Sequence, residues 1–169
     1  VFVTGGNGFL GSWLVADLVG KGANVTCIIR DKIADSNLVQ LGLMDKINVV
    51  SGTIEDYRTV ERALNEFEIE VVFHLAAQAI VGIANKSPVS TFETNIKGTW
   101  NVLEACRQVG IKRTVVASSD KAYGAHDKLP YKEDFPLNGL TPYEASKSCT
   151  DLLARTYAKT YGLAIAVTR

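Results

Sequence analysis

The sequence lacks net charge, a long hydrophobic run and a regular set of cysteines, and each absence excludes a class of protein. Lys and Arg number 18, as do Asp and Glu, so no basic surface is expected for nucleic acid or an anionic membrane. No apolar run is long enough to span a bilayer, and no signal segment is recognisable. Cys27, Cys106 and Cys149 lie far apart without metal-ligand spacing, which favours small apolar, reduced thiols in a cytoplasmic protein without a metal.

The composition is that of a folded domain. Of the 169 residues, 47% are hydrophobic, and a chain of this length can bury a substantial core. The chain starts in a strand-like run without Met and stops in the apolar run 164–169, so we expect a fragment of a longer protein. We predict one domain over residues 1–169.

Apolar strand-like runs alternate with helical patterns along the whole chain. Strands are expected at 1–4, 25–29, 48–51, 71–75, 114–117 and 163–168. Helices are expected at 12–21, 55–68, 89–109 and 143–161, with an irregular or helical segment at 33–44 and a loop before the third helix. This alternation predicts an α/β protein with a doubly wound parallel sheet of about six strands, a Rossmann fold, with helices on both faces.

A glycine-rich turn, TGGNGFLG at residues 4–11, joins the first strand to the first helix. Gly5 would permit the tight turn, Gly8 would let the backbone approach a pyrophosphate, and Gly11 would let the helix pack against its strand. Such a turn presents free N–H groups and the positive end of a helix dipole to a phosphate. The glycine spacing alone is equally compatible with ordinary turn chemistry, and its strand–helix context favours dinucleotide binding.

The end of the second strand carries Arg30 and Asp31 side by side. An acid at this place hydrogen-bonds the adenosine ribose of NAD, whereas an Arg can receive the extra phosphate of NADP. The pair leaves both cofactors open, and a solvated charge pair is the alternative.

Two polar residues lie within otherwise apolar elements. His74, in the apolar run 71–75, is expected to be a hydrogen-bonded core residue rather than an acid or base. Asn95, in the helical run 89–109, is expected to face water, to interrupt the helix or to hold an ordered water near the site.

Tyr143 and Lys147 are four residues apart on a predicted helix, so their side chains share one face. A free phenol, with a pKa of about 10, is a poor base at neutral pH, and a neighbouring ammonium favours its ionised form. The tyrosinate would accept a proton from a sugar or alcohol hydroxyl while hydride leaves for the cofactor, with Ser119 bonded to the same oxygen. A surface helix pair is the alternative for this spacing alone.

Together these residues resemble the extended short-chain dehydrogenase/reductase family, and within it the nucleotide-sugar epimerases and dehydratases. The resemblance covers essentially the whole chain and rests on the glycine turn, HLAA at 74–77, Asn95, SS at 118–119, YG at 123–124 and PYEASK at 142–147. It implies that Ser119, Tyr143 and Lys147 are catalytic. It also implies that NAD, or NADP because of Arg30, contacts the following positions: Gly5, Gly8, Phe9, Leu10, Gly11, Arg30, Asp31, Thr53, Ile54, Leu75, Ala76, Ala77, Asn95, Tyr143 and Lys147.

The residues after Ser119 favour one reaction within the family. In its sugar 4,6-dehydratases an Asp commonly follows the catalytic Ser or Thr and protonates the departing C6 hydroxyl, and a second acid is the base at C5. Here Asp120 is followed by Lys121, which resembles the branch acting on CDP-glucose, whereas 4-epimerases usually carry small, nonionisable residues. The resemblance therefore implies a dehydratase of an NDP-hexose such as CDP-glucose, with Lys121 as a candidate base. A loop ion pair is the alternative for these two residues.

The chain also departs from the family. Relatives often carry an Asp after the third strand that contacts adenine, where this chain has Thr53. The substrate-binding C-terminal part is missing, so we expect the chain alone to bind cofactor and to be inactive without that part.

Two other functions are compatible with these residues. One is an NDP-sugar 4-epimerase; the other, of a different class, is a non-catalytic NAD(P)-binding sensor, which has no need of Tyr143, Lys147 and Ser119. The resemblance further implies a nucleotide-sugar substrate and a homodimer formed through helices 89–109 and 143–161, and no nucleic acid or membrane partner is expected.

Overall fold

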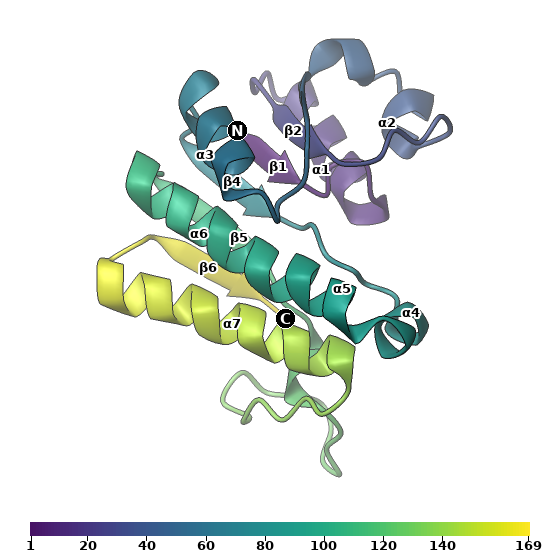
Figure 1. Ribbon diagram of the computed structural model, residues 1–169, viewed down its shortest axis with the longest axis vertical. Helices are drawn as coiled ribbons and strands as arrows, with labels where there is room; N and C mark the ends of the chain where they lie inside the picture. Colours follow the sequence, from purple (N-terminus) through teal and green to yellow (C-terminus); the bar gives the residue numbers. More distant parts are fainter.

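The computed structural model describes residues 1–169 as a six-stranded sheet covered by helices (Figure 1). The strands are β1 (Phe2–Thr4), β2 (Thr26–Ile29), β3 (Asn48–Ser51), β4 (Val71–His74), β5 (Arg113–Ala117) and β6 (Ile165–Thr168). Their order is β3-β2-β1-β4-β5-β6, and every neighbouring pair is parallel. The predicted doubly wound sheet is confirmed.

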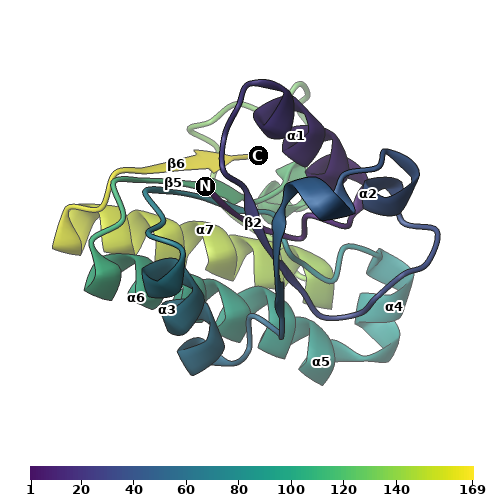
Figure 2. The ribbon, with the colours of Figure 1, turned by 90° about the horizontal axis from the view of Figure 1, so that it is seen from above.

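Helices occupy both faces of this sheet, as predicted. They are α1 (Phe9–Gly20), α2 (Asn37–Gln40), α3 (Tyr57–Glu66), α4 (Val81–Lys86), α5 (Pro88–Phe92), α6 (Gly98–Val109) and α7 (Pro142–Tyr161), with the 3-10 turns η1 (Met44–Lys46) and η3 (Asp120–Tyr123) and the π-helical turn η2 (Glu93–Lys97). Seen from above, α1 lies on one face, and α3, α6 and α7 lie on the other (Figure 2). No helix has the length and apolar character needed to cross a membrane.

The predicted helix 89–109 consists of three consecutive pieces, and a further helix precedes it. The pieces are α5, η2 and α6, so the helical path continues through a π-helical turn that contains Asn95. The additional helix, α4, lies in the segment expected to be a loop. The expected loop is only a short boundary between two helices, α4 and α5. Pro88 disfavours helical backbone at Ser87, which has φ −133°, and Pro88 itself occupies the first position of α5.

The register brings the carboxyl ends of the strands to one edge of the sheet. Thr4, the last residue of β1, pairs with Ile28 on one side and with His74 on the other. The chain leaves β1 towards β2 and β3 and then returns to the opposite side of β1 as β4. The reversal leaves a crevice between the loops after β1 and β4, which is where open α/β sheets bind ligands.

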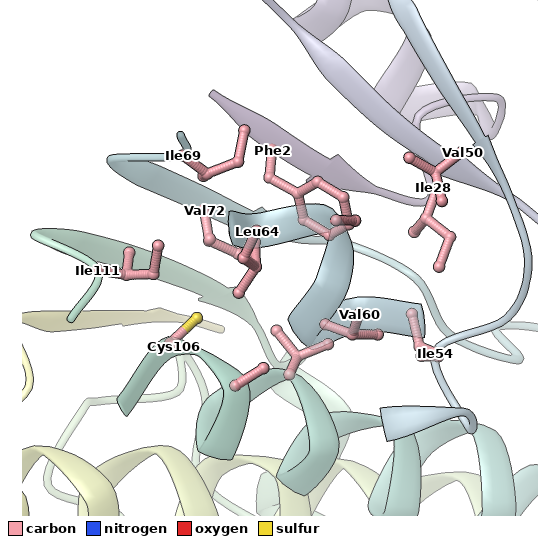
Figure 3. Packing of buried hydrophobic residues seen from close by; sticks show 13 residues of the cluster. Phe2, Ile28, Val50, Ile54, Val60, Leu64, Ile69, Val72, Cys106 and Ile111 are labelled. Carbon is pink, nitrogen blue, oxygen red and sulfur yellow. The ribbon is translucent and has the colours of Figure 1, made fainter. Parts of the chain in front are cut away.

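The main core fills the space between the sheet, α3 and α6. Figure 3 shows Phe2 and Val72 of the sheet meeting Leu64 of α3, and all three side chains are fully buried. Cys106 belongs to this cluster and Cys27 to the cluster on the α1 face. Burial raises the pKa of both thiols to about 12, so these two cysteines act as the small apolar residues expected from the sequence.

Candidate functional site

A cavity of about 520 Å³ lies at the carboxyl ends of the strands. Of the residues predicted to contact a dinucleotide, all except Asn95 line its wall: Gly5, Gly8, Phe9, Leu10, Gly11, Arg30, Asp31, Thr53, Ile54, Leu75, Ala76, Ala77, Tyr143 and Lys147. The fold thus brings segments from five of its strand ends and from α7 around one space.

The glycine turn forms the middle of the wall. Gly5 has φ +71°, and a Cβ on it would lie 2.8 Å from the Ala76 nitrogen, so only glycine fits. The Gly8 N–H donates to the Gly5 carbonyl over 3.0 Å, which closes the turn. A Cβ on Gly11 would overlap the Gly5 carbonyl, so α1 can pack against the turn only because position 11 is also glycine.

The N-terminus of α1 is left open towards this cavity. Helix α1 starts at Phe9, and no side chain caps it at Gly8. The first N–H groups of a helix have no partner within the helix, and the helix dipole favours a negative charge beside them. Together with the closely packed turn, this geometry fits a pyrophosphate.

A relay of buried hydrogen bonds fixes the loop after β4. Thr4 Oγ1 accepts from the main-chain N–H groups of Leu75 (3.1 Å) and Ala76 (3.0 Å) and lies 2.8 Å from His74 Nδ1. The Thr4 hydroxyl hydrogen is therefore donated to Nδ1, and Nε2 donates to Thr99 Oγ1 over 3.0 Å. Burial, with a smaller contribution from the charge of Lys147, lowers the pKa of His74 to about 3. His74 is a neutral, hydrogen-bonded core residue, as the sequence indicated.

Asn95 lies behind the cavity wall instead of on it. Its side chain is 1% exposed; Oδ1 accepts from the Gln78 N–H (2.7 Å), and Nδ2 donates to the Gln78 carbonyl (3.1 Å) and to Ser146 Oγ (2.8 Å). Ser146 Oγ donates in turn to the carbonyl of Tyr143. Asn95 therefore connects the loop after β4 to the first turn of α7, and its place in η2 agrees with the expected interruption of the helix.

The first two turns of α7 are fastened to the end of β5. Lys147 Nζ donates to the Ala117 carbonyl over 2.8 Å, and Ser118 Oγ donates to the Lys147 carbonyl over 3.1 Å. Burial lowers the pKa of Lys147 to about 8. Tyr143 and Lys147 are 8% and 5% exposed and both line the cavity. The predicted Tyr and Lys thus share one face of a helix and one cavity.

The residues at 119–121 lie beyond this wall. Ser119 Oγ donates to Asp120 Oδ1 over 3.1 Å and accepts from the Lys121 N–H over 3.2 Å. Ser119 is half-buried, whereas Asp120 and Lys121 are exposed. The structure places all three directly after β5, on the same strand end that holds Lys147, but Ser118 is the serine that lines the cavity.

A buried ion pair anchors the turn that carries Asp120 and Lys121. Arg169 Nε lies 2.6 Å from Asp151 Oδ2 on α7, and the Asp151 side chain is fully buried. Arg169 Nη1 also donates to the hydroxyl of Tyr123, the last residue of η3, over 2.8 Å. The ends of β6 and η3 and the middle of α7 are therefore joined through one guanidinium group.

Arg30 and Asp31 form an exposed ion pair at the edge of the cavity. Arg30 Nε lies 2.7 Å from Asp31 Oδ2, and Asn7 Nδ2 donates to the Asp31 carbonyl over 3.2 Å. Both charged residues thus line the same part of the wall.

Sequence reasoning missed several residues of the wall: Asn7, Ile28, Ile33, Gly52, Glu55, Ala79, Thr94, Ala117 and Ser118. Asn7 and Ser118 belong to the motifs that carried the resemblance, so their positions offered a signal. Glu55 and Thr94 are 39 residues apart and have no motif. Their contact exists only in three dimensions.

The comparisons with known proteins place the chain among the extended short-chain dehydrogenase/reductases, a class of NAD-dependent epimerases and dehydratases. The chain belongs to the GDP-mannose 4,6 dehydratase family, whose sequence profile matches residues 2–169.

The similar proteins do not all catalyse the same reaction. CDP-glucose 4,6-dehydratase of Salmonella typhimurium is 37% identical over 164 residues, which are 95% of this chain and 46% of that protein. The dTDP-glucose 4,6-dehydratase of Streptomyces venezuelae, solved with NAD, has a TM-score of 0.89 and 32% identity over 99% of this chain and 54% of that one. The UDP-glucose 4-epimerase of Thermus thermophilus, solved in complex with NAD, has a TM-score of 0.87 and is 35% identical. The match covers 99% of this chain and 53% of that one. The chain spans about half the length of the relatives it matches.

Proposed function

We propose that this chain is the NAD-binding and catalytic part of a nucleotide-sugar 4,6-dehydratase acting on an NDP-hexose such as CDP-glucose. The observation that carries the proposal is the pair Asp120–Lys121, which follows Ser119 at the end of the strand to which Lys147 is bonded. The 37% identity to a CDP-glucose 4,6-dehydratase supports the same reaction. A non-catalytic sensor is not favoured, because it would not need this set of groups.

The cavity wall fits NAD. The glycine turn and the open end of α1 would hold the pyrophosphate, and Asp31 would accept from the adenosine ribose hydroxyls. The guanidinium of Arg30 is already paired with Asp31, which supports NAD over NADP. NAD, when bound, supplies an acceptor that takes a hydride from C4 of the sugar and returns it to C6.

Tyr143, Lys147 and Ser119 would handle the proton at C4. Tyr143 would accept the proton of the C4 hydroxyl as that carbon is oxidised, and the Ser119 hydroxyl, which donates to Asp120 in this structure, would turn to donate to the same oxygen. The depressed pKa of Lys147, about 8, lets it exchange a proton with solvent near neutral pH. Replacing Tyr143 with Phe removes the acid–base group, and we expect kcat to fall by about 10²- to 10⁴-fold.

Asp120 and Lys121 would carry the elimination. The C4 ketone acidifies the C5 hydrogen, and Lys121 accepts that proton. Asp120 donates its proton to the C6 hydroxyl, which leaves as water. The hydride returned to C6 and the proton that Lys121 gives back to C5 would complete the 4-keto-6-deoxy sugar. Asp120 would regain a proton from solvent as Tyr143 releases the proton of the C4 hydroxyl, so the net change is the loss of one water.

The test uses the full-length protein that contains this chain, because the chain alone is expected to be inactive, together with NAD and a panel of CDP-, dTDP-, UDP- and GDP-hexoses. We expect a 4-keto-6-deoxy product, with CDP-glucose preferred. Asp120→Asn should abolish that product and leave NAD binding unchanged, whereas Asp134→Asn, an exposed residue of the following loop, should change neither. Undiminished dehydration by Asp120→Asn would contradict the assignment. A 4-epimer formed without loss of water would instead identify an epimerase, as in several relatives.

We also propose a homodimer formed through α5–α6 and α7. These helices lie next to one another on the same face of the sheet (Figure 1). Val89, Trp100 and Leu152 on them are 72%, 43% and 53% exposed, so apolar surface is available to a second copy. Sedimentation equilibrium should give twice the chain mass, and Trp100→Glu should lower it towards the monomer value. A monomer at all concentrations would contradict this proposal.

A further inference from the structure

One end of the cavity contains an acidic side chain that the proposed reaction does not use. Glu55 lies between β3 and α3 and lines the wall together with Ile28, Ile33 and Ile54. It takes part in none of the ion pairs of the structure. A half-buried carboxylate beside apolar side chains needs hydrogen-bond donors, since its charge is otherwise poorly solvated.

Two hydroxyl groups hold this carboxylate in a defined position. Thr53 Oγ1 donates to Glu55 Oε2, and Thr94 Oγ1 of η2 donates to Glu55 Oε1. Thr53 and Thr94 line the same cavity and approach the carboxylate from different segments of the chain. Each oxygen retains capacity for a further donor, and in this cavity that donor has to come from the ligand or from water.

From these contacts we propose that Glu55 accepts a hydrogen bond from the exocyclic amino group of adenine and thereby selects an adenine dinucleotide. The inference rests on the proposed function, because it assumes that NAD occupies the cavity. The glycine turn then holds the pyrophosphate in the middle, and Tyr143 and Lys147 mark the nicotinamide end. The adenosine therefore extends over the ends of β2 and β3, where Ile28 and Glu55 lie.

The chemistry of the base makes this carboxylate selective. The exocyclic amine is the only strong hydrogen-bond donor on the adenine ring, and an ionised carboxylate can only accept. A hypoxanthine ring carries a carbonyl oxygen in place of that amine, so two acceptors would face one another. Glu55 is thus a specificity-determining residue for the base, beside the apolar side chains that contact its faces.

A purely structural role for Glu55 makes a different prediction. If the carboxylate only joins the β3–α3 loop to η2, its removal weakens the binding of every dinucleotide by the same factor. If it recognises the amine, its removal changes the ratio between two dinucleotides. The decisive quantity is therefore the ratio of two dissociation constants, which loop stability does not affect.

The experiment measures Kd by isothermal titration calorimetry for NAD and for nicotinamide hypoxanthine dinucleotide. We expect the wild-type protein to bind NAD about tenfold more tightly, since a hydrogen bond to a charged group contributes to that extent. Glu55→Gln should remove or invert the preference, because a Gln amide can donate to the hypoxanthine carbonyl. The matched control is Glu93→Gln, which changes an exposed acid that precedes Thr94 and is absent from the cavity wall. It should retain the wild-type ratio.

A second variant keeps the proposal testable if Glu55→Gln does not fold. Thr94→Val removes one of the two donors that orient the carboxylate, and it should lower the same ratio by a smaller factor. An unchanged ratio in the variants, with NAD still bound, would overturn the role of Glu55 and leave the proposed function intact. A wild-type protein that binds neither dinucleotide would overturn both.

Discussion

The two sides of the cavity are held in place by different means. On the β1–α1 side the main chain itself makes the wall: Gly5 and Gly11 are fixed by close contacts in which a side chain would overlap the backbone. On the β4–β5–α7 side the wall is set by buried polar side chains, among them Thr4, His74 and Asn95. The geometry of the first side therefore depends on positions that have no side chain. The geometry of the second side depends on buried polar groups that all have hydrogen-bond partners.

The largest effect is expected on the backbone side. Gly11→Ala would place a Cβ 2.8 Å from the Gly5 carbonyl carbon, so the turn must shift. We expect a loss of about 4 kcal/mol in the free energy of unfolding and no measurable NAD binding. The measurements are urea denaturation and calorimetry.

The control for this variant lies in the same helix. A Cβ on Gly20 would meet nothing within 4 Å, and Gly20→Ala should raise stability by about 0.5 kcal/mol. Equal effects of the two substitutions would show that helix propensity, and not close packing, governs this side.

The next effect concerns the buried ion pair on the side-chain side. Asp151→Asn leaves the Arg169 guanidinium, whose side chain is 18% exposed, without its charged partner. We expect the free energy of unfolding to fall by about 3 kcal/mol, as for other buried ion pairs from which one member is removed. Chemical denaturation measures this change in stability.

An exposed pair of the same type provides the comparison. Asp17 and Lys21 are 57% and 71% exposed and are four residues apart on α1. Asp17→Asn should therefore change stability by no more than about 0.5 kcal/mol. A similar fall in the free energy of unfolding for Asp17→Asn and Asp151→Asn would show that burial does not determine the contribution of these ion pairs to stability.

A pH dependence should identify the buried lysine. The folded-state pKa of Lys147 is about 8 against an ordinary value of 10.5, so between these pH values the unfolded chain binds more protons. The free energy of unfolding should accordingly rise with pH in this window, by at most about 3 kcal/mol. Lys147→Met should lack this rise. The quantity to compare is the difference between the two proteins at each pH, because tyrosines and cysteines titrate in both, and a constant difference would refute the assignment.

Among the substitutions of buried groups, the smallest effect is expected for the relay through Thr4. Thr4→Val removes the acceptor of two main-chain N–H groups and the donor to His74. We expect the free energy of unfolding to fall by about 2 kcal/mol, because the buried main-chain N–H groups and the His74 nitrogen are left without a hydrogen-bond partner. Thr26→Val, on the adjacent strand, removes only a 3.3 Å hydrogen bond from Asn48 and should have less effect. Thermal unfolding followed by circular dichroism distinguishes them.

This contrast also explains what the sequence could predict. The glycine turn is recognisable because steric exclusion leaves a fixed spacing of glycines, and the alternation of apolar runs predicts the sheet for a similar local reason. Tyr143 and Lys147 are recognisable because both lie on one helix. The fold class and most of the wall were therefore predictable.

The contacts between distant segments were not predictable from spacing. Asp151 and Arg169, or Glu55 and Thr94, come together only when strands and helices have packed. Asn95 shows the same limit: its residue type suggested a role at the site, but its partners at Gln78 and Ser146 place it behind the wall. Hydrogen bonding of this kind depends on tertiary geometry, on which local pattern carries no information.

The π-helical turn at Glu93–Lys97 has a consequence for changes in chain length. A π-helical turn contains one residue more than an α-helical turn, and the wider turn absorbs that residue, so the helices on either side keep nearly the facing of a regular helix. Deleting one residue there would restore a regular helix with α5 and α6 facing as they do now, but it would shift residues within the turn around the helix axis by up to about 100°. Thr94 and Asn95 would then not both reach Glu55 and Gln78. This turn should therefore tolerate many substitutions on its exposed side but no single-residue deletion, and its length is a stricter requirement than its composition.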